Sequence, residues 1–196
     1  HLRRPLGRSG SAGRGAAMTD LSRSRLWVMR LSFVALALVI LFFHLLPLET
    51  TPRAWAGPDL LLGFACAWGL RRPEYVPALF LALVFLLADL LLQRPPGLWA
   101  VLALIGVENL KSRGRHLRDA SFAAEWLTVA VILTIVIFAN RILLSLALVP
   151  TPAMTLNLTE LALTMLAYPL IVAVTHGIMG VRKTAPGDLD ALGKRV

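Results

Sequence analysis

The chain has 196 residues, of which 57% are hydrophobic and 16% are charged, and its mean hydropathy is +0.72 with a formal net charge of +9. It contains one cysteine, Cys66, which excludes an internal disulfide, and its histidines lack the spacing of zinc ligands. Soluble globular chains carry about 25% charged residues, so this composition excludes an ordinary soluble domain and predicts a protein that folds in a lipid bilayer.

The first residues require separate treatment. Residues 1–17 contain no methionine, are rich in Gly, Ser and Arg, and precede Met18. We interpret them as a tag, a vector scar or a misassigned start and leave them outside the expected fold. Residues 18–25 would then form a short cytoplasmic N-terminus. The apolar run over residues 31–46 is longer than the roughly 7–15 residues of a signal-peptide core, which favours an uncleaved first span.

Six apolar segments follow one another along the chain. They predict an all-α integral membrane protein with a six-helix bundle over residues 26–180 and a cytoplasmic tail over residues 181–196. A helix needs about 20 apolar residues to cross a bilayer. The second and fourth segments are shorter, so each is also compatible with a re-entrant or protein-buried helix. In chain order the segments are 26–46, 60–70, 76–92, 98–110, 122–149 and 159–179.

The basic residues are distributed unevenly between the loops. With residues 1–17 left aside, twelve Lys and Arg fall in segments predicted to lie inside, against Arg53 and Arg94 in the outer loops. This bias follows the positive-inside rule, and it favours six crossings with both termini in the cytoplasm. The positive net charge is therefore explained by topology, and we expect no nucleic-acid partner, since no basic face with interleaved aromatic residues is present.

The loops between these segments are short, and they carry no catalytic motif. The sequence has no Gly-rich phosphate loop, no nucleophile elbow, no His-Glu-x-x-His and no cysteine pair. We therefore expect no enzyme activity, no cofactor and no metal site. Any specific chemistry would depend on polar residues inside the spans.

Two charged residues lie within apolar segments at similar depth, near the outer side. Asp89 falls in the third segment, and Arg141 follows Asn140 in the fifth. A lone charge in hydrocarbon costs about 2.5–3.5 kcal/mol, so such groups usually face protein or water and find partners. We hypothesise that Asp89 and Arg141 face each other and tie two helices together. The alternative is that each side chain reaches the outer interface separately.

Two further positions have structural interpretations. Glu108 lies three residues before Lys111, where an i,i+3 ion pair at the inner interface is expected. Pro169, after Tyr168 in the sixth segment, should loosen or kink that helix because proline lacks the N–H of the helical ladder.

Most tryptophans fall near the ends of the expected spans. This placement is typical of an aromatic belt at the two membrane interfaces, where the rings anchor the protein. We therefore do not expect these tryptophans to form a ligand-binding site. The residues concerned are Trp27, Trp55, Trp99 and Trp126.

An acidic residue followed by a Pro-Gly turn carries a family resemblance. Asp89 with Pro95, Pro96 and Gly97, within "GPDLLLGFACAWGLRRPEYVPALFLALVFLLADLLLQRPPGLWA", resembles the most recognisable element of the rod shape-determining protein MreD family, in its alphaproteobacterial form. The resemblance continues through "FAAEWL", "LAYPL" and the tail "VRKTAPGDLDALGKRV", and it covers residues 26–196. It implies a multi-pass subunit of the bacterial inner membrane in the complex that builds lateral-wall peptidoglycan and controls cell shape. The implied partners are an MreC-like single-span protein, RodA, a class B transpeptidase and, indirectly, MreB.

The same resemblance implies a fold similar to the six-helix substrate-binding subunits of energy-coupling-factor vitamin transporters. The first span, "SFVALALVILFF", lacks the Ala-x-x-x-Ala spacing with which those subunits dock their coupling protein. Two functions then compete. The first is a non-catalytic scaffold or regulatory subunit that holds the spans of partner proteins. The second is a small-molecule carrier with a pocket near the outer face lined by Asp89, Asn140 and Arg141.

Overall fold

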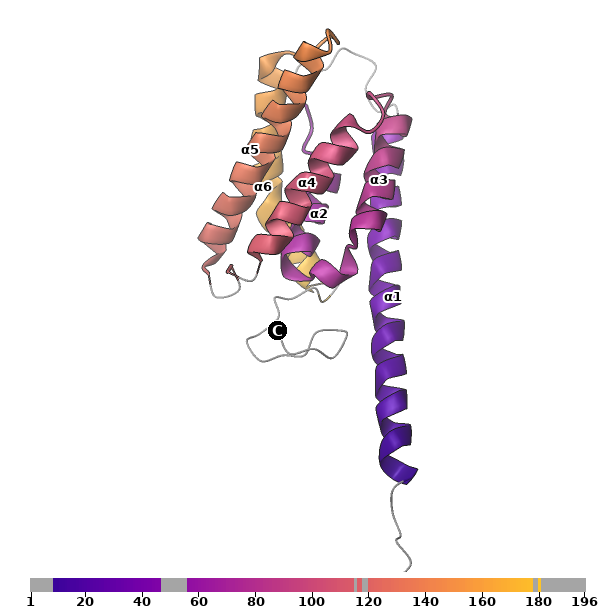
Figure 1. Cartoon of the computed structure of the whole chain (residues 1–196). Helices are drawn as coiled ribbons and strands as arrows, with labels where there is room; N and C mark the ends of the chain where they lie inside the picture. Colours follow the sequence, from indigo (N-terminus) through magenta and orange to yellow (C-terminus); the bar gives the residue numbers. More distant parts are fainter. Residues whose placement is uncertain (1–8, 47–55, 115, 118–119, 178–179, 181–196) are drawn as a thin grey trace, which may run out of the picture.

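The described part of the chain is entirely helical. The computed structural model describes residues 9–46, 56–114, 116–117, 120–177 and 180, with the backbone alone for residues 9–22. Within these residues there are six α-helices, one short 3-10 helix (η1) and no strand. Consecutive α-helices run in opposite directions along the bundle (Figure 1). The helices are α1 (Ser9–Leu45), α2 (Leu60–Arg71), η1 (Pro73–Tyr75), α3 (Ala78–Leu91), α4 (Leu98–Arg113), α5 (Phe122–Leu146) and α6 (Met154–Gly177).

The six helices coincide with the six apolar segments expected from the sequence. Three of them are long and apolar enough to cross a membrane: Arg23–Leu45 within α1, and the whole of α5 and α6. These helices indicate a membrane protein. Helices α2 and α3 are apolar but shorter. Helix α6 begins at Met154, ahead of the expected residue 159, because no proline follows Pro152 until Pro169.

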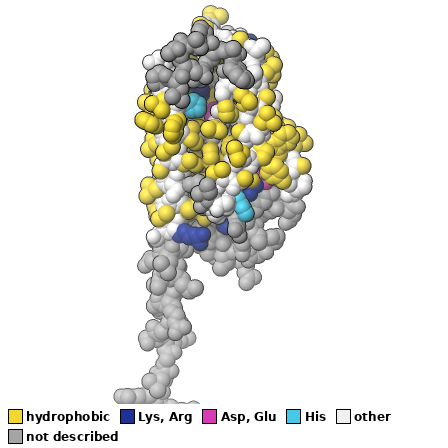
Figure 2. Space-filling view, turned by 180° about the vertical axis from the view of Figure 1, so that it is seen from behind, with side chains coloured by type: hydrophobic (Ala, Val, Ile, Leu, Met, Phe, Trp, Pro, Cys, Tyr) yellow, Lys and Arg dark blue, Asp and Glu magenta, His cyan; other side chains and the backbone are white. Residues whose placement is uncertain are grey.

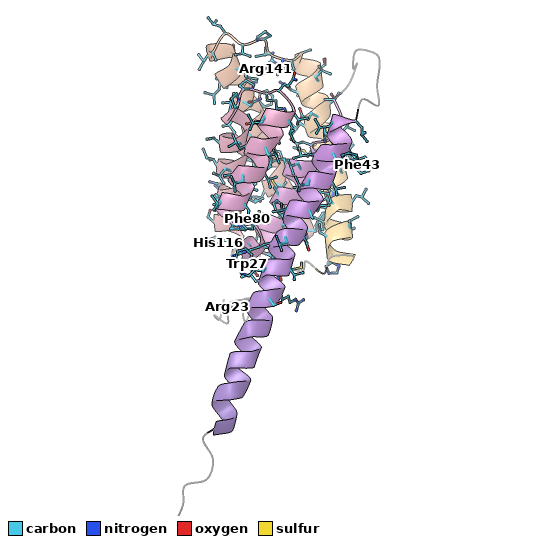
Figure 3. The ribbon with its side chains drawn as sticks, turned by 90° about the vertical axis from the view of Figure 1, so that its right-hand side faces the viewer. Arg23, Trp27, Phe43, Phe80, His116 and Arg141 are labelled. Atoms are coloured by element: carbon cyan, nitrogen blue, oxygen red, sulfur yellow. The ribbon has the colours of Figure 1, made fainter. Side chains whose placement is uncertain are left out.

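Helix α1 is longer than expected. It begins at Ser9, inside residues 1–17, which the sequence predicts to lie outside the fold. The physical reason is that no proline stands between Pro5 and Pro47, so nothing interrupts the helical hydrogen bonds. The N-terminal part of α1 projects beyond the other helices (Figure 1). The remainder of α1 crosses one face of the bundle, where Trp27 packs near Phe80 of α3 with ring centroids 6.2 Å apart (Figure 3).

Helix α2 lies at the centre of the bundle. Every residue from Leu61 to Arg71 except Phe64 is buried, as expected for a helix that is apolar on all sides. It packs against α4 and α6, and more weakly against α1. The short second segment therefore forms a helix that other helices of the bundle surround.

Glycines allow the central helices to approach each other closely. A Cβ atom at Gly69 of α2 would lie 2.8 Å from Val107 Cγ1 of α4, and one at Gly106 of α4 would lie 2.8 Å from Val136 Cγ2 of α5. Such distances are shorter than real Cβ contacts, so only glycine fits without movement of the neighbour. Small residues of this kind let helices pack tightly without a hydrophobic driving force.

The alternation of helix directions gives the bundle two distinct ends (Figure 1). The basic end carries residues 71–75 and 111–114, and the opposite end carries residues 92–97 and 147–153. At the basic end Arg30 Nε of α1 donates to the carbonyl of Glu74 at 3.1 Å. Seen from behind, hydrophobic side chains form a broad band across the middle of the described surface (Figure 2).

Candidate functional site

Asp89 caps the helix that follows it. Its carboxylate is fully buried, and Oδ2 accepts hydrogen bonds from the backbone N–H groups of Gly97 at 3.0 Å and Ala100 at 3.1 Å. Gly97 is the N-cap residue of α4 and has a φ of 88°, a left-handed conformation that favours glycine. The first N–H groups of a helix lack helical partners and carry partial positive charge. Asp89, at the end of α3, therefore holds the start of α4.

The prolines complete this turn. The backbone N–H of Arg94 donates to the Asp89 carbonyl at 2.9 Å, and that of Leu98 donates to the Pro95 carbonyl at 3.3 Å. Pro95 and Pro96 are exposed. Because proline has a fixed φ and no N–H, the two residues lead the chain away from α3 and toward the cap at Gly97.

The expected pairing of Asp89 with Arg141 is wrong. The carboxylate of Asp89 is directed at the N–H groups of α4, and its Oδ1 atom is buried without a hydrogen-bond partner. Arg141 Nη1 instead donates to the carbonyl of Pro152 at 2.6 Å, at the end of the bundle away from the basic turns (Figure 3). Arg141 therefore braces the turn between α5 and α6. Asp89 lies near this same end, in the last turn of α3. It does not pair with Arg141, because the N–H groups at the start of α4 already bind the Asp89 carboxylate.

A buried ionic cluster joins three helices near the basic end. Arg71 Nη2 of α2 lies 2.9 Å from Oε1 and 3.2 Å from Oε2 of Glu125, in the first turn of α5. The hydroxyl of Tyr168 in α6 donates to Glu125 Oε1 at 3.0 Å. The side chains of Arg71 and Glu125 are 8% and 0% exposed, so each charge is compensated by its partner in a low-dielectric environment.

Sequence reasoning did not identify this cluster. It assigned Arg71 to an inner loop, considered Tyr168 only beside the proline, and gave Glu125 no role. The signal was present nonetheless: Glu125 is the single acidic residue in the apolar helix α5. Glu125, like Asp89, is a charged residue in an apolar segment, and such a charge requires a partner.

Pro169 does not interrupt α6, which continues from Met154 to Gly177. Its missing N–H would leave the carbonyl of Met165 without its helical donor. Trp126 Nε1 of α5 donates to that carbonyl at 3.0 Å. A side chain from the neighbouring helix thus replaces the hydrogen bond that proline removes.

The tryptophans do not behave as one belt. Trp27 is 52% exposed, in agreement with an interfacial position, whereas Trp99 is only 5% exposed and packs in the core. Trp126 bonds to α6. Trp55 lies outside the described residues. The expectation of a belt is therefore wrong for Trp99, because nearness to the end of a span does not determine which way a ring points.

The expected pair of Glu108 and Lys111 is present at the basic end. Lys111 Nζ lies 2.5 Å from Glu108 Oε1. The same ammonium group also donates to the carbonyl of Val76, just before α3. The pair therefore ties α4 to the turn that follows η1.

Two adjoining cavities occupy the opposite end, with volumes of about 300 Å³ and about 250 Å³. Both are lined by Arg94, Trp99 and Glu160. Asn140 lines the larger one, but Asp89 and Arg141, also expected in a pocket at this position, line neither. The expected lining is therefore wrong for Asp89 and Arg141, because both side chains are engaged with backbone groups.

A groove of about 380 Å³ separates α4 from α5 on the outside of the bundle. Its walls are apolar along most of the length, with Asn109 and Arg113 toward the basic end. Arg113 Nε donates to Asn109 Oδ1 at 2.9 Å. Among the described residues, no group of three or more His, Cys, Asp and Glu side chains is placed to hold a metal ion.

Comparison of the chain with protein-family models, with curated proteins and with solved structures found no match.

Proposed function

We propose that this protein is a non-catalytic scaffold or regulatory subunit of the bacterial inner membrane, of the MreD kind, in the complex that builds lateral-wall peptidoglycan. The supporting observation is that buried charged side chains hold helices together. Arg71 and Glu125 bind each other across α2 and α5, and Asp89 binds the N-terminus of α4. An ion-coupled carrier needs titratable groups that exchange partners inside the membrane. Charges committed to holding helices together instead suit a stable platform.

The proposal includes six membrane crossings. Helices that alternate in direction bring the Lys- and Arg-rich turns to one end (Figure 1), which the positive-inside rule assigns to the cytoplasm. The first helix rises from that end and the last returns to it, so both terminal segments would be cytoplasmic. Helix α2 has 12 residues and spans about 18 Å; a short buried helix is acceptable at membrane depth because protein surrounds it. The likeness in fold to energy-coupling-factor substrate-binding subunits belongs to the same proposal.

The groove between α4 and α5 is the surface that we assign to a partner. Exposed apolar side chains such as Ile105 and Ile135 line it, and they would pack against the single transmembrane helix of an MreC-like protein. Arg113 at the basic end offers a positive group to an acidic residue flanking that helix. RodA and the class B transpeptidase would join through the same assembly, and MreB through its cytoplasmic side.

Intramembrane cysteine crosslinking tests this assignment. In a Cys66→Ala background, Ile105→Cys and Ile135→Cys should crosslink to single cysteines placed along the MreC-like span. Leu166→Cys in α6, which is 72% exposed but lies away from the groove, is the matched control. Equal crosslinking from Leu166→Cys would contradict the docking surface. Depletion of the protein should round the cells, and cells that keep their rod shape would contradict the proposed complex.

The two cavities at the opposite end favour a second candidate function, the binding of a small molecule by the bundle. Mass spectrometry of the purified protein would distinguish the two candidates. A stoichiometric co-purified metabolite would favour binding, while its absence together with cell rounding on depletion would favour a scaffold alone.

A further inference from the structure

The cavities at the opposite end expose charged groups of both signs. Arg94 and Glu160 line both cavities. Among the described residues, neither the guanidinium of Arg94 nor the carboxylate of Glu160 makes a hydrogen bond or an ion pair. The Arg94 guanidinium lies over the Trp99 ring, 5.4 Å from its centroid. The larger cavity is therefore lined by one cationic and one anionic group that are not bonded to each other, while the smaller cavity is also lined by Asp59.

This arrangement differs from the rest of the bundle. Other half-buried or buried charges are bonded: Arg71 binds Glu125, Lys111 binds Glu108, Asp89 caps α4, and Asp59, which lines the smaller cavity, caps α2. Leaving charged groups unbonded in a half-buried site costs free energy. A pair of opposite charges that is kept apart around a cavity is the arrangement expected of a binding site rather than of helix packing.

Amide side chains line the same cavity. Asn157 is 9% exposed and Asn140 is half-buried, and both line the larger cavity. Neither side chain makes a hydrogen bond within the described residues. No amide atom of either residue is among the fully buried atoms that lack a partner, so these amide groups are open to the cavity. Their free donors and acceptors thus add to the polar wall that Arg94 and Glu160 begin.

We infer that the larger cavity binds a small zwitterion, of the class of a free α-amino acid. The carboxylate would lie against Arg94, whose planar guanidinium suits a bidentate contact. The ammonium group would lie against Glu160, and the amides of Asn140 and Asn157 would orient the remaining atoms. A simple anion or cation would leave one wall charge uncompensated. A volume of about 300 Å³ suits a molecule of this size.

This inference rests on the second candidate function, small-molecule binding, but not on transport, since a scaffold could equally hold such a ligand. The test uses the full chain, purified in detergent. Free α-amino acids are added one at a time, and binding is measured by titration calorimetry and by the shift in thermal unfolding. At least one should bind, whereas the amine and the carboxylic acid that each lack one charge, such as ethylamine and propionate for alanine, should bind about tenfold more weakly or worse.

Variants locate the site. Arg94→Gln and Glu160→Gln should each weaken binding by about tenfold or more, while Arg23→Gln, at an exposed position of α1 away from the cavities (Figure 3), should leave it unchanged. Thermal unfolding without ligand shows whether each variant is folded. If either variant fails to fold, alkylation of Asn140→Cys in a Cys66→Ala background replaces it, and the bound amino acid should slow that reaction.

Several outcomes would overturn the inference: no amino acid binds, the single-charge analogues bind equally well, the variants keep wild-type affinity, or the amino acid fails to protect Asn140→Cys. A co-purified metabolite that amino acids do not displace would support the second candidate function while overturning this ligand class. The two failures are therefore distinguishable.

Discussion

The indole N–H of Trp126 donates to the carbonyl of Met165 at 3.0 Å, at the position where Pro169 deprives α6 of a helical hydrogen bond. The preceding residue, Glu125, accepts from Tyr168, which precedes the proline. Two consecutive side chains of α5 thus bind two residues of α6, Met165 and Tyr168, which are about one helical turn apart. The contact between α5 and α6 is therefore specified by hydrogen bonds as well as by apolar packing.

A double-mutant cycle tests this replacement bond. Trp126→Phe should lower the free energy of unfolding by about 0.6 kcal/mol, the mean for interhelical hydrogen bonds in a membrane protein, and by no more than about 1.7 kcal/mol, the maximum. In a Pro169→Ala background the same substitution should cost less, because the new backbone N–H serves the Met165 carbonyl. Denaturation of the four proteins in detergent measures the coupling. An equal cost in both backgrounds would show that the indole bond does not substitute for the helical one.

Breaking the buried ionic cluster should be the most damaging single change. Glu125→Gln leaves the Arg71 guanidinium buried without its counter-charge, and the expected loss is about 3–5 kcal/mol. The double variant Arg71→Met, Glu125→Leu should recover part of that loss, since no uncompensated charge remains. Glu108→Gln is the control, because Glu108 is 42% exposed and its pair should contribute less than about 1 kcal/mol. Thermal unfolding of each variant decides the order.

Replacement of Asp89 should act on the start of α4. Asp89→Ala removes the acceptor for the N–H groups of Gly97 and Ala100 and should cost about 0.5–2 kcal/mol, whereas Asp89→Asn keeps an acceptor and should cost less. Hydrogen exchange of residues 97–100 should accelerate in the same order. Reversing both charges, Asp89→Arg with Arg141→Asp, should not restore stability. Restoration would mean that the two side chains interact after all.

Substitution by alanine should change the free energy of unfolding differently at two glycines of α2. A Cβ at Gly69 meets Val107 Cγ1 at 2.8 Å, and a β-branched side chain in a helix has little rotamer freedom. Overpacking costs about 1–3 kcal/mol, more than the roughly 1 kcal/mol that alanine gains over glycine in a helix. Gly69→Ala should therefore destabilise. At Gly63 the neighbour is the flexible end of Ile171, so Gly63→Ala should be nearly neutral in the same unfolding assay.

Accessibility labelling examines the six crossings. In a Cys66→Ala background, Pro73→Cys and Ser112→Cys should both resist a membrane-impermeant maleimide in intact cells and react in inside-out vesicles. Ala153→Cys, at the opposite end, should show the reverse pattern. Reaction of Pro73→Cys and Ser112→Cys from different sides of the membrane would contradict the topology.

The helices themselves were predictable because their signals are local. Apolar runs bounded by Pro-Pro-Gly after Arg94, or by the polar segment before Phe122, place helix ends within a few residues. The i,i+3 pair of Glu108 and Lys111 was predictable for the same reason. The partners of Asp89 and Glu125 were not, because they depend on which face of each helix meets which neighbour.

The local sequence also does not indicate the direction in which a side chain points from its helix. Similar depth in two segments suggested that Asp89 and Arg141 meet, but depth does not determine rotation about the helix axis. The cavity residue Glu160 was overlooked because it stands near the start of α6, where a carboxylate looks like an ordinary helix-end residue. Only its position across from Arg94 gives it significance.

The central place of α2 has a consequence for biogenesis. Lipid alone holds a 12-residue helix poorly, and two of the helices that surround α2, namely α4 and α6, are synthesised after it. The nascent α2 is therefore secured only when the ribosome has delivered the last helix. Truncation anywhere before α6 should leave an unassembled chain, and quality-control proteolysis of such products is the expected fate.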